Sequence, residues 1–267
     1  METWDWAADG LAEDKPNVAR MYDYFLGGEH NFPADREMAD KAIAIYPGLT
    51  EVAKINRAFL RRAVRYLCVK GIRQFIDIGS GLPTLGNVHE VAQEVAPDAK
   101  VVYCDIDQTA VTYCRMMLIG NPDATVVHGD VRHVEQILAH RDLRHLIDLG
   151  QPVAVLVLGL LHFFVDDDHP ETFIARIFDT VAPGSYLAIS HASSDLRPED
   201  GERITKLYER SGNPIRFRTH AEIAKLFGGF TLVEPGLVEI PDWRPSADVG
   251  VIPEAVVSGY AGVGHRP

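Results

Sequence analysis

The sequence has few cysteines, and their number and spacing argue against a fold stabilised by disulfides or by structural zinc. Its three cysteines, Cys68, Cys104 and Cys114, form no Cys-x-x-Cys pair and have no histidine at a spacing typical of zinc ligands. An odd number of unpaired cysteines argues against a disulfide framework and against a structural zinc site. We therefore expect three ordinary buried thiols.

The sequence also lacks a long uninterrupted apolar segment. Its longest apolar run, residues 153–165, contains Gly159 and His162 and is shorter than the roughly 20 residues that a membrane span needs. Residues 1–10 combine tryptophans with acidic residues, without the basic and apolar regions of a secretory signal. We expect no membrane partner and a cytoplasmic location.

Positive charge is scarce relative to negative charge. The chain has 26 lysines and arginines against 38 aspartates and glutamates, a formal net charge of -12. The long-range field of such a chain repels phosphate backbones and anionic membranes, so we expect no nucleic-acid partner. With 267 residues, 46% of them hydrophobic, the chain is long enough to bury one large core.

The pattern of apolar residues changes near residue 70. Helices are predicted before it at residues 16–26, 33–45 and 50–69, each opening with a proline or a capping residue. From Gly71 onwards short apolar segments alternate with helical patterns, which is typical of βαβ units and a mainly parallel sheet. We expect a helical extension at residues 1–70 and a doubly wound α/β domain at residues 71–267, forming one compact unit.

Within the second region, strands and helices are predicted in alternation. The expected strands are residues 74–78, 100–105, 125–128, 153–158 and 185–190. The expected helices are residues 88–95, 108–118, 133–139, 170–181, 199–211 and 219–226. Two later β-like runs, 230–240 and 256–263, are joined by a proline-rich connection at 242–253.

A short glycine motif follows the first expected strand. The segment IDIGSG, residues 76–81, lies where a doubly wound sheet presents its ligand crevice. Gly79 and Gly81 permit a tight turn and a close approach of ligand to backbone, and Asp77 is placed to hold a cationic or hydroxyl-bearing group. The third glycine of the dinucleotide fingerprint is missing, since LPT follows at 82–84, which argues against a pyrophosphate ligand.

Acidic residues end the next two expected strands as well. Asp105, followed by Ile106, ends the second strand, a position suited to accept hydrogen bonds from ribose hydroxyls. Gly129 and Asp130 end the third. Each aspartate alone is equally consistent with a helix cap or a turn, but the ordered series at three strand ends favours a nucleoside pocket.

Four segments resemble, in order and position, the first four motifs of class I S-adenosylmethionine methyltransferases. They are DIGSG at 77–81, YCDID at 103–107, GD at 129–130 and GLLH at 159–162. A closer resemblance, to a bacterial, actinobacterial-type family of S-adenosylmethionine methyltransferases without a settled substrate, rests on segments spread along the chain. These are PNVARMYDYFLGG at 16–28, NF at 31–32, ADR at 34–36, DIGSGLPT at 77–84, NVHE at 87–90 and YAGVG at 260–264.

This resemblance covers nearly the whole chain and implies a fold, a cofactor and residue roles. The implied fold is a Rossmann-like sheet of seven strands with the last strand antiparallel, and the implied cofactor is S-adenosylmethionine. Residues 79–81 would lie against its methionine and ribose portions, and Asp105 would hold the ribose hydroxyls. Residues 130–131 would flank the adenine, and residues 159–162 would lie near the sulfonium and the acceptor.

The N-terminal signature contains aromatic residues around a carboxylate. Tyr22, Tyr24 and Phe25 flank Asp23, just before glycines 27–28. Aromatic faces and a carboxylate attract a sulfonium cation, and such a site would make the N-terminal helices a lid over the cofactor; aromatics at this spacing equally pack a helix onto a protein body. The predicted cofactor residues are Tyr22, Tyr24, Gly28, Asp77, Gly79, Ser80, Gly81, Asp105, Ile106, Gly129, Asp130, Val131, Gly159 and Leu160.

Two histidines are candidates for the chemistry. Methyl transfer requires alignment of acceptor and sulfonium and, for a protonated acceptor, removal of a proton. His162 follows the fourth expected strand and His191 the fifth, and imidazole titrates near neutrality. Either could act as general base, with His162 preferred; a hydrogen-bonded structural histidine is the alternative for each. Arg20 and Arg57 are candidate partners for the cofactor carboxylate.

The leading functional prediction is methyl transfer to a small-molecule acceptor. Two alternatives stay open: a regulatory protein that binds S-adenosylmethionine without catalysis, and a nicotinamide-dependent oxidoreductase, against which the missing third glycine counts. The acidic run at residues 166–168 precedes Pro170 and predicts a solvated loop and helix start rather than a cation site. We expect no metal, and the sequence carries no signal for an oligomeric state.

Overall fold

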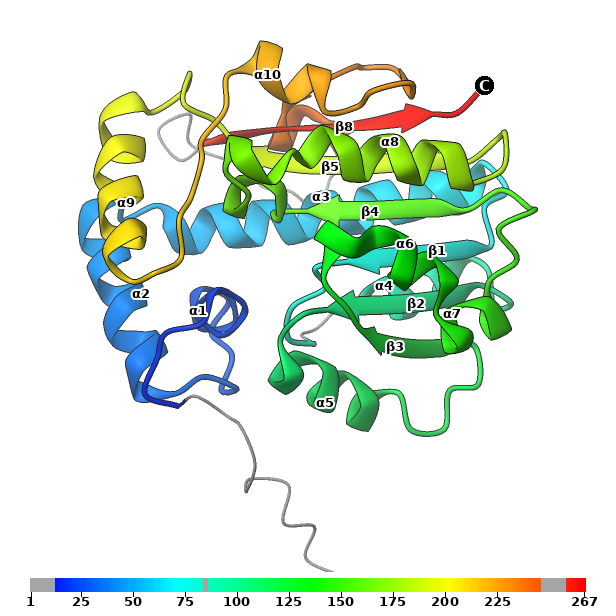
Figure 1. Cartoon of the computed structure of the whole chain (residues 1–267), viewed down its shortest axis with the longest axis horizontal. Coiled ribbons are helices and arrows are strands. Elements are labelled where there is room, and N and C mark those ends of the chain that lie inside the picture. The colour runs from blue at the N-terminus through cyan, green and yellow to red at the C-terminus, as the bar shows by residue number, and fades with distance from the viewer. Residues whose placement is uncertain (1–12, 84–85, 246–257) are drawn as a thin grey trace, which may run out of the picture.

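A mostly parallel β-sheet forms the centre of the protein (Figure 1). The computed structural model describes residues 13–83, 86–245 and 258–267. The strands are β1 Gln74–Ile78, β2 Lys100–Asp105, β3 Ala124–His128, β4 Ala154–Leu158, β5 Tyr186–Ala192, β6 Thr231–Leu232, β7 Val238–Glu239 and β8 Gly259–His265. Their order is β3-β2-β1-β4-β5-β8-β6, with β7 also paired to β8. Strands β1 to β5 are parallel, whereas β8 runs antiparallel to β5, β6 and β7.

The central strands are short apolar segments because both faces of the sheet are covered. All the residues of β1 are buried, as are those of β2 after Lys100, which is the pattern of a parallel sheet between two helical layers. Register pairs Ile78 at the end of β1 with Cys104 near the end of β2. The carboxyl ends of the parallel strands therefore meet at one edge of the sheet.

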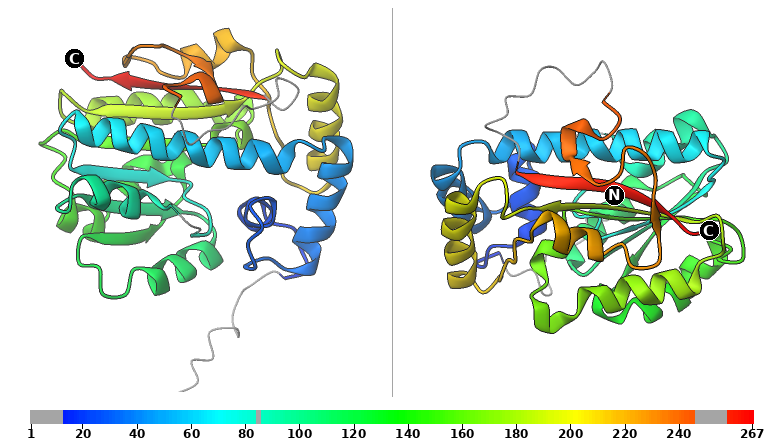
Figure 2. Two further views of the ribbon diagram at one scale, coloured as in Figure 1. Left: turned by 180° about the vertical axis from the view of Figure 1, so that it is seen from behind. Right: turned by 90° about the horizontal axis from the view of Figure 1, so that it is seen from above.

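Helices cover both faces (Figure 2). They are α1 Val18–Phe25, α2 Pro33–Ile45, α3 Leu49–Val69, α4 Val88–Val95, α5 Gln108–Met117, α6 Val134–Ala139, α7 Arg141–Leu146, α8 Pro170–Thr180, α9 Pro198–Arg210 and α10 His220–Lys225. Helices α3, α4 and α5 pack on one face through residues such as Phe59, Val88 and Val111. Helices α6, α7, α8 and α10 pack on the other through residues such as Ile137 and Phe173. Alternate strand residues thus face different helical layers.

A third apolar cluster lies beyond one end of the sheet. It joins Met21 and Phe25 of α1 and Met38 of α2 to Ile204 and Tyr208 of α9, and Figures 1 and 2 show these helices gathered at that end. Helix α3, although predicted as part of the N-terminal extension, packs mainly in the sheet cluster. The division at residue 70 stays a prediction, but α1 and α2 are the N-terminal helices whose packing is separate from the sheet.

Most elements have the predicted type, and the doubly wound α/β fold is confirmed. The run predicted at residues 230–240 is instead two short strands, β6 and β7. Pro235 lacks an N–H group and Gly236 adopts a φ of 94°, so the chain turns between β6 and β7. Helix α7 was missed because it buries one side chain, Leu143, too few for visible periodicity. Residues 246–253 of the predicted connection and 256–257 of the last predicted strand lie outside the described residues.

None of the helices among the described residues is long and apolar enough to cross a bilayer.

Candidate functional site

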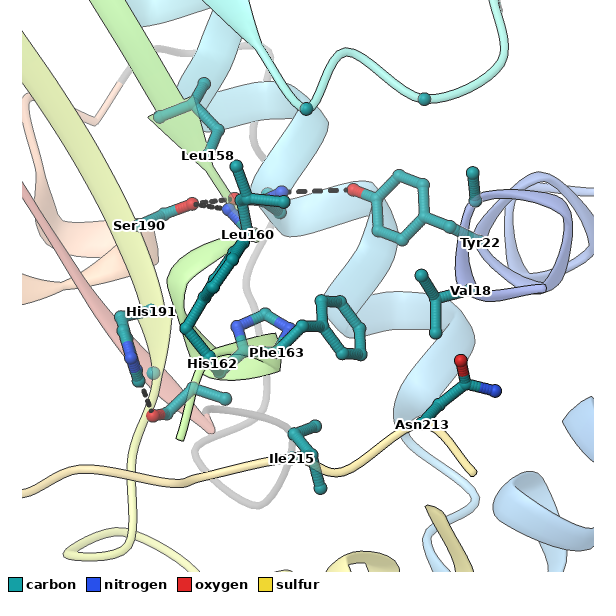
Figure 3. Close-up of a pocket in the computed structure, with 18 of the residues that line it drawn as sticks. Val18, Tyr22, Leu158, Leu160, His162, Phe163, Ser190, His191, Asn213 and Ile215 are labelled. Carbon is teal, nitrogen blue, oxygen red and sulfur yellow. Dashed lines mark hydrogen bonds between the residues drawn. The ribbon is translucent and has the colours of Figure 1, made fainter. Parts of the chain in front are cut away.

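A cavity of about 670 Å³ lies at the edge where the parallel strands end (Figure 3). Small-molecule sites typically have volumes of about 300–1,000 Å³. One part, here called the strand-edge half, is lined by residues 77–81, 105–107, 129–132 and 158–160. The other part, the helical chamber, is lined by residues of α1, the α2–α3 connection, α3, α9 and segment 212–217, together with His162 and Phe163.

The glycine motif at residues 79–81 lines one side of the strand-edge half. Gly79 and Gly81 have φ values of 71° and 64°, a left-handed conformation that glycine adopts without strain. The Gly79 N–H donates to Cys104 O over 2.8 Å, which ties the loop to β2. A Cβ on Gly81 would meet Ala19 Cβ at 4.0 Å, whereas one on Gly79 would come within 2.7 Å of the Leu160 side chain. The backbone at Gly81 therefore leaves room for a ligand.

Asp105 is held by the same loop. Its Oδ2 accepts a hydrogen bond from the Gly81 N–H at 2.7 Å, and its Oδ1 accepts one from the Asp107 N–H at 2.9 Å. Burial raises the pKa of Asp105 above its ordinary value, although these N–H donors act in the opposite direction. Each carboxylate oxygen has further acceptor capacity. The arrangement suits a ligand with two adjacent hydroxyls, and the ribose contact stays a prediction.

Apolar surface and a second carboxylate follow beyond Asp105. Ile106 is 56% exposed although it is a large apolar residue, and Val131 is buried; both line the cavity, as does Gly129. Asp130 forms an ion pair with Arg132 at 2.7 Å. Burial raises the pKa of Asp130, but its hydrogen bonds with Arg132 outweigh that and lower it below the ordinary value.

Asp77 is a buried acid at the centre of this half. Burial raises its pKa to about 7; the Arg57 guanidinium opposes the rise and Asp105 adds to it. Arg57 lines the cavity, whereas Arg20, the other predicted partner for a cofactor carboxylate, does not. Arg20 is instead paired with buried Asp35 at 2.7 Å.

The strand-edge half contains what an amino-acid nucleoside needs. The Ser80 hydroxyl is buried and has no hydrogen-bond partner among the described residues, so a ligand that replaces the missing partner is favoured. Open glycine backbone, a carboxylate for hydroxyls and the Arg57 guanidinium for a carboxylate lie around one space. The residues present therefore fit S-adenosylmethionine.

The two predicted histidines have different environments. His162 lines the cavity, and its buried Nδ1 has no partner in the described part of the chain. Burial lowers the pKa of His162 well below its ordinary value, and the positive charges of neighbouring His191 and Arg218 would lower it further. Figure 3 places the rings of His162 and Phe163 between the strand ends and Val18 of α1. His162 is thus a neutral imidazole at the junction of the two halves.

Both ring nitrogens of His191 are already engaged. Its Nδ1 lies 2.6 Å from Ala192 O and its Nε2 lies 3.1 Å from Arg218 Nη1. Because a carbonyl only accepts and a guanidinium only donates, Nδ1 carries the proton and Nε2 accepts. Burial lowers the pKa of His191 to about 4. His191 lines the cavity, but its geometry favours the structural alternative over general-base catalysis.

A hydrogen-bond chain connects the N-terminal helix to the strand ends. The Tyr22 hydroxyl donates to Ala53 O at 3.0 Å and accepts from Asn56 Nδ2 at 3.1 Å. Ser190 Oγ donates to Asn56 Oδ1 at 2.6 Å and accepts from the Gly159 N–H at 2.9 Å. Tyr22, Gly159 and Leu160 all line the cavity.

Two predicted cofactor residues lie elsewhere. The Tyr24 hydroxyl donates to Asp40 at 3.0 Å on the surface, and Gly28 packs against the Asp23 side chain. Neither lines the cavity. Residues two apart on a helix point in different directions, so α1 can turn Tyr22 inward only by turning Tyr24 away. Their proposed contact with the cofactor is not supported by this placement.

Sequence reasoning missed Arg218, a buried residue beneath the His162 loop. It is 4% exposed. Its guanidinium donates to Leu161 O and Phe164 O, both at 3.0 Å, to His191 Nε2, and to Asp166 at 3.2 Å. These contacts join β5 to the loop after β4. An arginine next to a predicted helix carries no pattern from which such a role could be read.

The sequence reasoning also missed Tyr208 of α9. Its side chain is 6% exposed and lines the helical chamber. Burial raises the pKa of its hydroxyl far above the ordinary value, so the group stays protonated. Among the described residues there is also no cluster of three or more His, Cys, Asp or Glu that could hold a metal ion.

Comparisons with known proteins agree with this geometry. Residues 4–267 match the model of a family described as S-adenosyl methyltransferase. A crystal structure of a protein from Thermobifida fusca, provisionally named a methyltransferase, is 42% identical over 98% of this chain and 99% of that chain, with a TM-score of 0.92. A DUF574 family protein from Streptomyces avermitilis is 37% identical over 96% of this chain and 99% of that chain, also with a TM-score of 0.92. No curated protein matches.

The family match extends over nearly the entire sequence, including the α1 signature and the motifs at the strand ends. It confirms the resemblance drawn from those motifs. The chain therefore belongs to the S-adenosyl methyltransferase family, whose members use S-adenosylmethionine as cosubstrate.

Proposed function

We propose that this protein transfers a methyl group from S-adenosylmethionine to a small molecule bound in the helical chamber. The observation that carries this proposal is that one continuous cavity of about 670 Å³ joins a polar half, lined by the glycine motif, to an apolar half. Such continuity places a cofactor and an acceptor against each other without intervening water.

The strand-edge half would hold the cofactor. Asp105 would accept hydrogen bonds from the ribose hydroxyls, and Ile106 and Val131 would contact the adenine. Gly79, Ser80 and Gly81 would lie along the ribose and methionine portions, with Arg57 near the carboxylate. The support is the lining of the cavity, the unpartnered Ser80 hydroxyl and the two N–H groups that orient Asp105.

Helix α1 would close one side of the bound cofactor. The Tyr22 ring lines the cavity, and its hydroxyl is fixed to α3 through Ala53 and Asn56. A tyrosine face near a sulfonium adds a cation–π attraction of roughly 0.5–2 kcal/mol. We therefore keep the lid proposal for α1 through Tyr22 and not through Tyr24.

The chain's contribution to the reaction would be alignment and proton removal. When bound, S-adenosylmethionine supplies an electrophilic methyl group on a positively charged sulfur. His162, neutral and with a free Nδ1, would receive a proton from an acceptor hydroxyl or amine at the junction of the two halves. His191 and Arg218 would hold the loop that carries His162.

Calorimetry tests the cofactor part of this proposal. The purified protein is titrated separately with S-adenosylmethionine, S-adenosylhomocysteine and NADH, and the same titrations are made with Asp105→Ala. The proposal expects binding of both adenosyl ligands at a Kd on the order of micromolar, loss of this binding in the variant, and no binding of NADH. No adenosyl binding, or a preference for NADH, contradicts it.

A turnover assay separates catalysis from binding alone. Release of S-adenosylhomocysteine is measured while the protein is incubated with S-adenosylmethionine and a library of small hydroxylated and aminated molecules. Acceptor-dependent release supports the enzyme, and its loss in His162→Gln with cofactor affinity retained supports the role of His162. Tight cofactor binding without turnover on any acceptor favours a regulatory protein instead.

A further inference from the structure

We propose that the helical chamber is an acceptor site for an uncharged, largely aromatic small molecule that carries hydroxyl groups, and that Tyr208 hydrogen-bonds to it. This inference rests on the proposed function and adds the chemical class of the acceptor. Three properties of the chamber carry it: its apolar walls, its lack of unbalanced charge and its unpartnered hydrogen-bonding groups.

The walls are apolar and rich in aromatic rings. Helices α1 and α9 and the segment after α9 face one another across the chamber, and their side chains belong to one apolar cluster. Such a surface favours a ligand that buries apolar area and can pack against ring faces. The residues that line it include Phe25, Phe163, Ile204, Tyr208, Ile215 and Phe217.

Charge within the chamber is balanced. Among the described residues of α1, α3, α9 and segment 212–217 that line the cavity, the charged ones are Arg57, Arg197 and Asp200. The Arg57 guanidinium is bonded to Gly86 and Asn87 beside the strand-edge half, where the proposed function assigns it to the cofactor, so the chamber itself holds the other two. They form an ion pair at 2.7 Å, and the Arg197 guanidinium also stacks on the Tyr46 ring at 4.4 Å. An ionised acceptor would enter this space without an available counter-charge, which is strongly unfavourable in an apolar site. The chamber therefore selects a neutral molecule.

Two neutral groups are available to hydrogen-bond such a molecule. The Tyr208 hydroxyl makes no hydrogen bond with any residue in the described ranges, although the side chain is 6% exposed. His162 Nδ1 is buried and has no partner in those ranges. Because buried polar groups are normally paired, hydroxyls on the acceptor are the expected partners. Tyr208 would bind one end of the molecule, and His162 would face the hydroxyl that reacts.

The proposed reaction on this class balances simply. The acceptor oxygen forms a bond to the methyl carbon while the carbon–sulfur bond breaks, and sulfur keeps the electron pair and leaves as a neutral thioether. The hydroxyl proton passes to His162 and from there to solvent. The product is a methyl ether and S-adenosylhomocysteine.

The test compares two probes that differ in one group. Protein saturated with S-adenosylhomocysteine is titrated with 2,6-dihydroxynaphthalene and with 6-hydroxy-2-naphthoate, in which a carboxylate replaces one hydroxyl. We expect the dihydroxy probe to bind at least about tenfold more tightly, because the carboxylate has no counter-charge in the chamber. Equal or tighter binding of the naphthoate overturns the proposal of a neutral acceptor.

A pair of tyrosine variants tests the contact. Tyr208→Phe keeps the ring and should weaken binding of the dihydroxy probe roughly three- to tenfold, the effect of one neutral hydrogen bond. Tyr24→Phe is the matched control, since the Tyr24 hydroxyl lies at the surface on Asp40, and it should leave probe binding unchanged. Equal effects of the two variants, or no effect of Tyr208→Phe, overturn the assignment of Tyr208.

Failure of this inference is distinguishable from failure of the proposed function. S-adenosylhomocysteine affinity is measured first and without a probe. If the nucleoside does not bind, the proposed function fails whatever the naphthols do. If it binds and the charged probe is preferred, the cofactor site stands and the acceptor class proposed here is wrong.

Discussion

The two halves of the cavity are made by different kinds of chain segment. The strand-edge half consists of loops that leave the carboxyl ends of β1 to β4, and its groups are backbone N–H donors, glycines and carboxylates. The helical chamber consists mainly of side chains from helices α1, α3 and α9, which come from the first and last thirds of the chain. The polar groups thus come from short turns after successive strands of one sheet, whereas the apolar shape depends on how separate helices pack beyond that sheet.

This difference predicts how each half responds to substitution. Loss of a carboxylate at a strand end should change ligand affinity and leave the fold largely intact, because the sheet holds the loop. Loss of a residue that joins distant segments should change stability first. The predictions below test this contrast, from the largest expected effect to the smallest.

Arg218→Ala should reduce the free energy of unfolding by about 3–5 kcal/mol. The substitution leaves Leu161 O, Phe164 O and His191 Nε2 without their buried donor. Arg216→Ala is the control, because the Arg216 side chain is 37% exposed in its ion pairs and should contribute less than about 1 kcal/mol. Urea denaturation measures both. A similar loss in the two variants would show that the buried hydrogen bonds of Arg218 stabilise the fold no more than exposed ion pairs do.

Asp105→Ala should weaken S-adenosylhomocysteine binding about 100-fold, the effect of losing two hydrogen bonds to a charged acceptor. Asp130→Ala should weaken it less than about tenfold, because Asp130 is already engaged by Arg132. Calorimetry compares the two variants with wild type. If the urea midpoints of both variants stay near that of wild type, the strand-end carboxylates act on ligand affinity and not on stability, as this contrast requires. A much lower urea midpoint for Asp105→Ala would contradict it.

Opposite pH dependences are expected from Asp77 and His191. Burial raises the pKa of Asp77 to about 7, so between about pH 4 and 7 the folded state binds a proton that the unfolded chain releases, and stability falls as pH rises. Burial lowers the pKa of His191 to about 4, so between about pH 6.5 and 4 the unfolded chain binds the extra proton and stability falls as pH falls. Each slope is at most about 1.4 kcal/mol per pH unit.

Urea denaturation across pH 4.5 to 7 separates the two contributions. Asp77→Asn should become increasingly more stable than wild type as pH rises, because it removes an acid that is disfavoured when ionised. The difference in the free energy of unfolding between wild type and His191→Gln should shrink as pH falls. The reason is that His191 is protonated more readily in the unfolded chain, which lowers the stability of wild type but not of the variant. Parallel curves for a variant and wild type would mean that the residue does not titrate differently in the folded state.

Tyr22→Phe and Tyr24→Phe should give the smallest effects and test which tyrosine faces the cavity. Removal of the Tyr22 hydroxyl breaks its bonds with Ala53 and Asn56 and should reduce stability by about 1 kcal/mol. The exposed Tyr24 hydroxyl should contribute less than about 0.5 kcal/mol. Thermal unfolding of both variants, with and without S-adenosylhomocysteine, measures this. A larger effect at Tyr24 would reverse the assignment.

The strand-edge half was largely predictable because its signals are local. Asp77, Asp105 and Asp130 each follow a short apolar strand, and in a parallel sheet such ends meet at one edge. Gly79 and Gly81 indicated a turn because glycine alone adopts a φ above zero without strain. These rules act over a few residues, so they can be applied before any tertiary contact is known.

The helical chamber was predictable only in its α1 wall. The motif predicted Tyr22, Tyr24 and Gly28 alike as cofactor residues, because it does not indicate which face of a short helix turns inward. Only Tyr22 of the three lines the cavity. Tyr208 and Arg218 gave no signal, since their roles arise from α9 joining α1 and α2 in one apolar cluster and from the chain after α9 returning beneath the His162 loop. His162 and His191 looked alike until their hydrogen-bond partners separated them.

By itself, the sequence determined the sheet class, the glycine turn, the acidic strand ends and the family, because glycine conformation, strand patterning and motif order are properties of neighbouring residues. The tertiary structure decided which histidine has a ring nitrogen without a partner among the described residues and which tyrosine faces the cavity, and it supplies the observations behind the proposed acceptor class. Those features depend on burial and on contacts between distant segments. Apolar packing is non-directional, so its partners are settled only when the whole chain has folded.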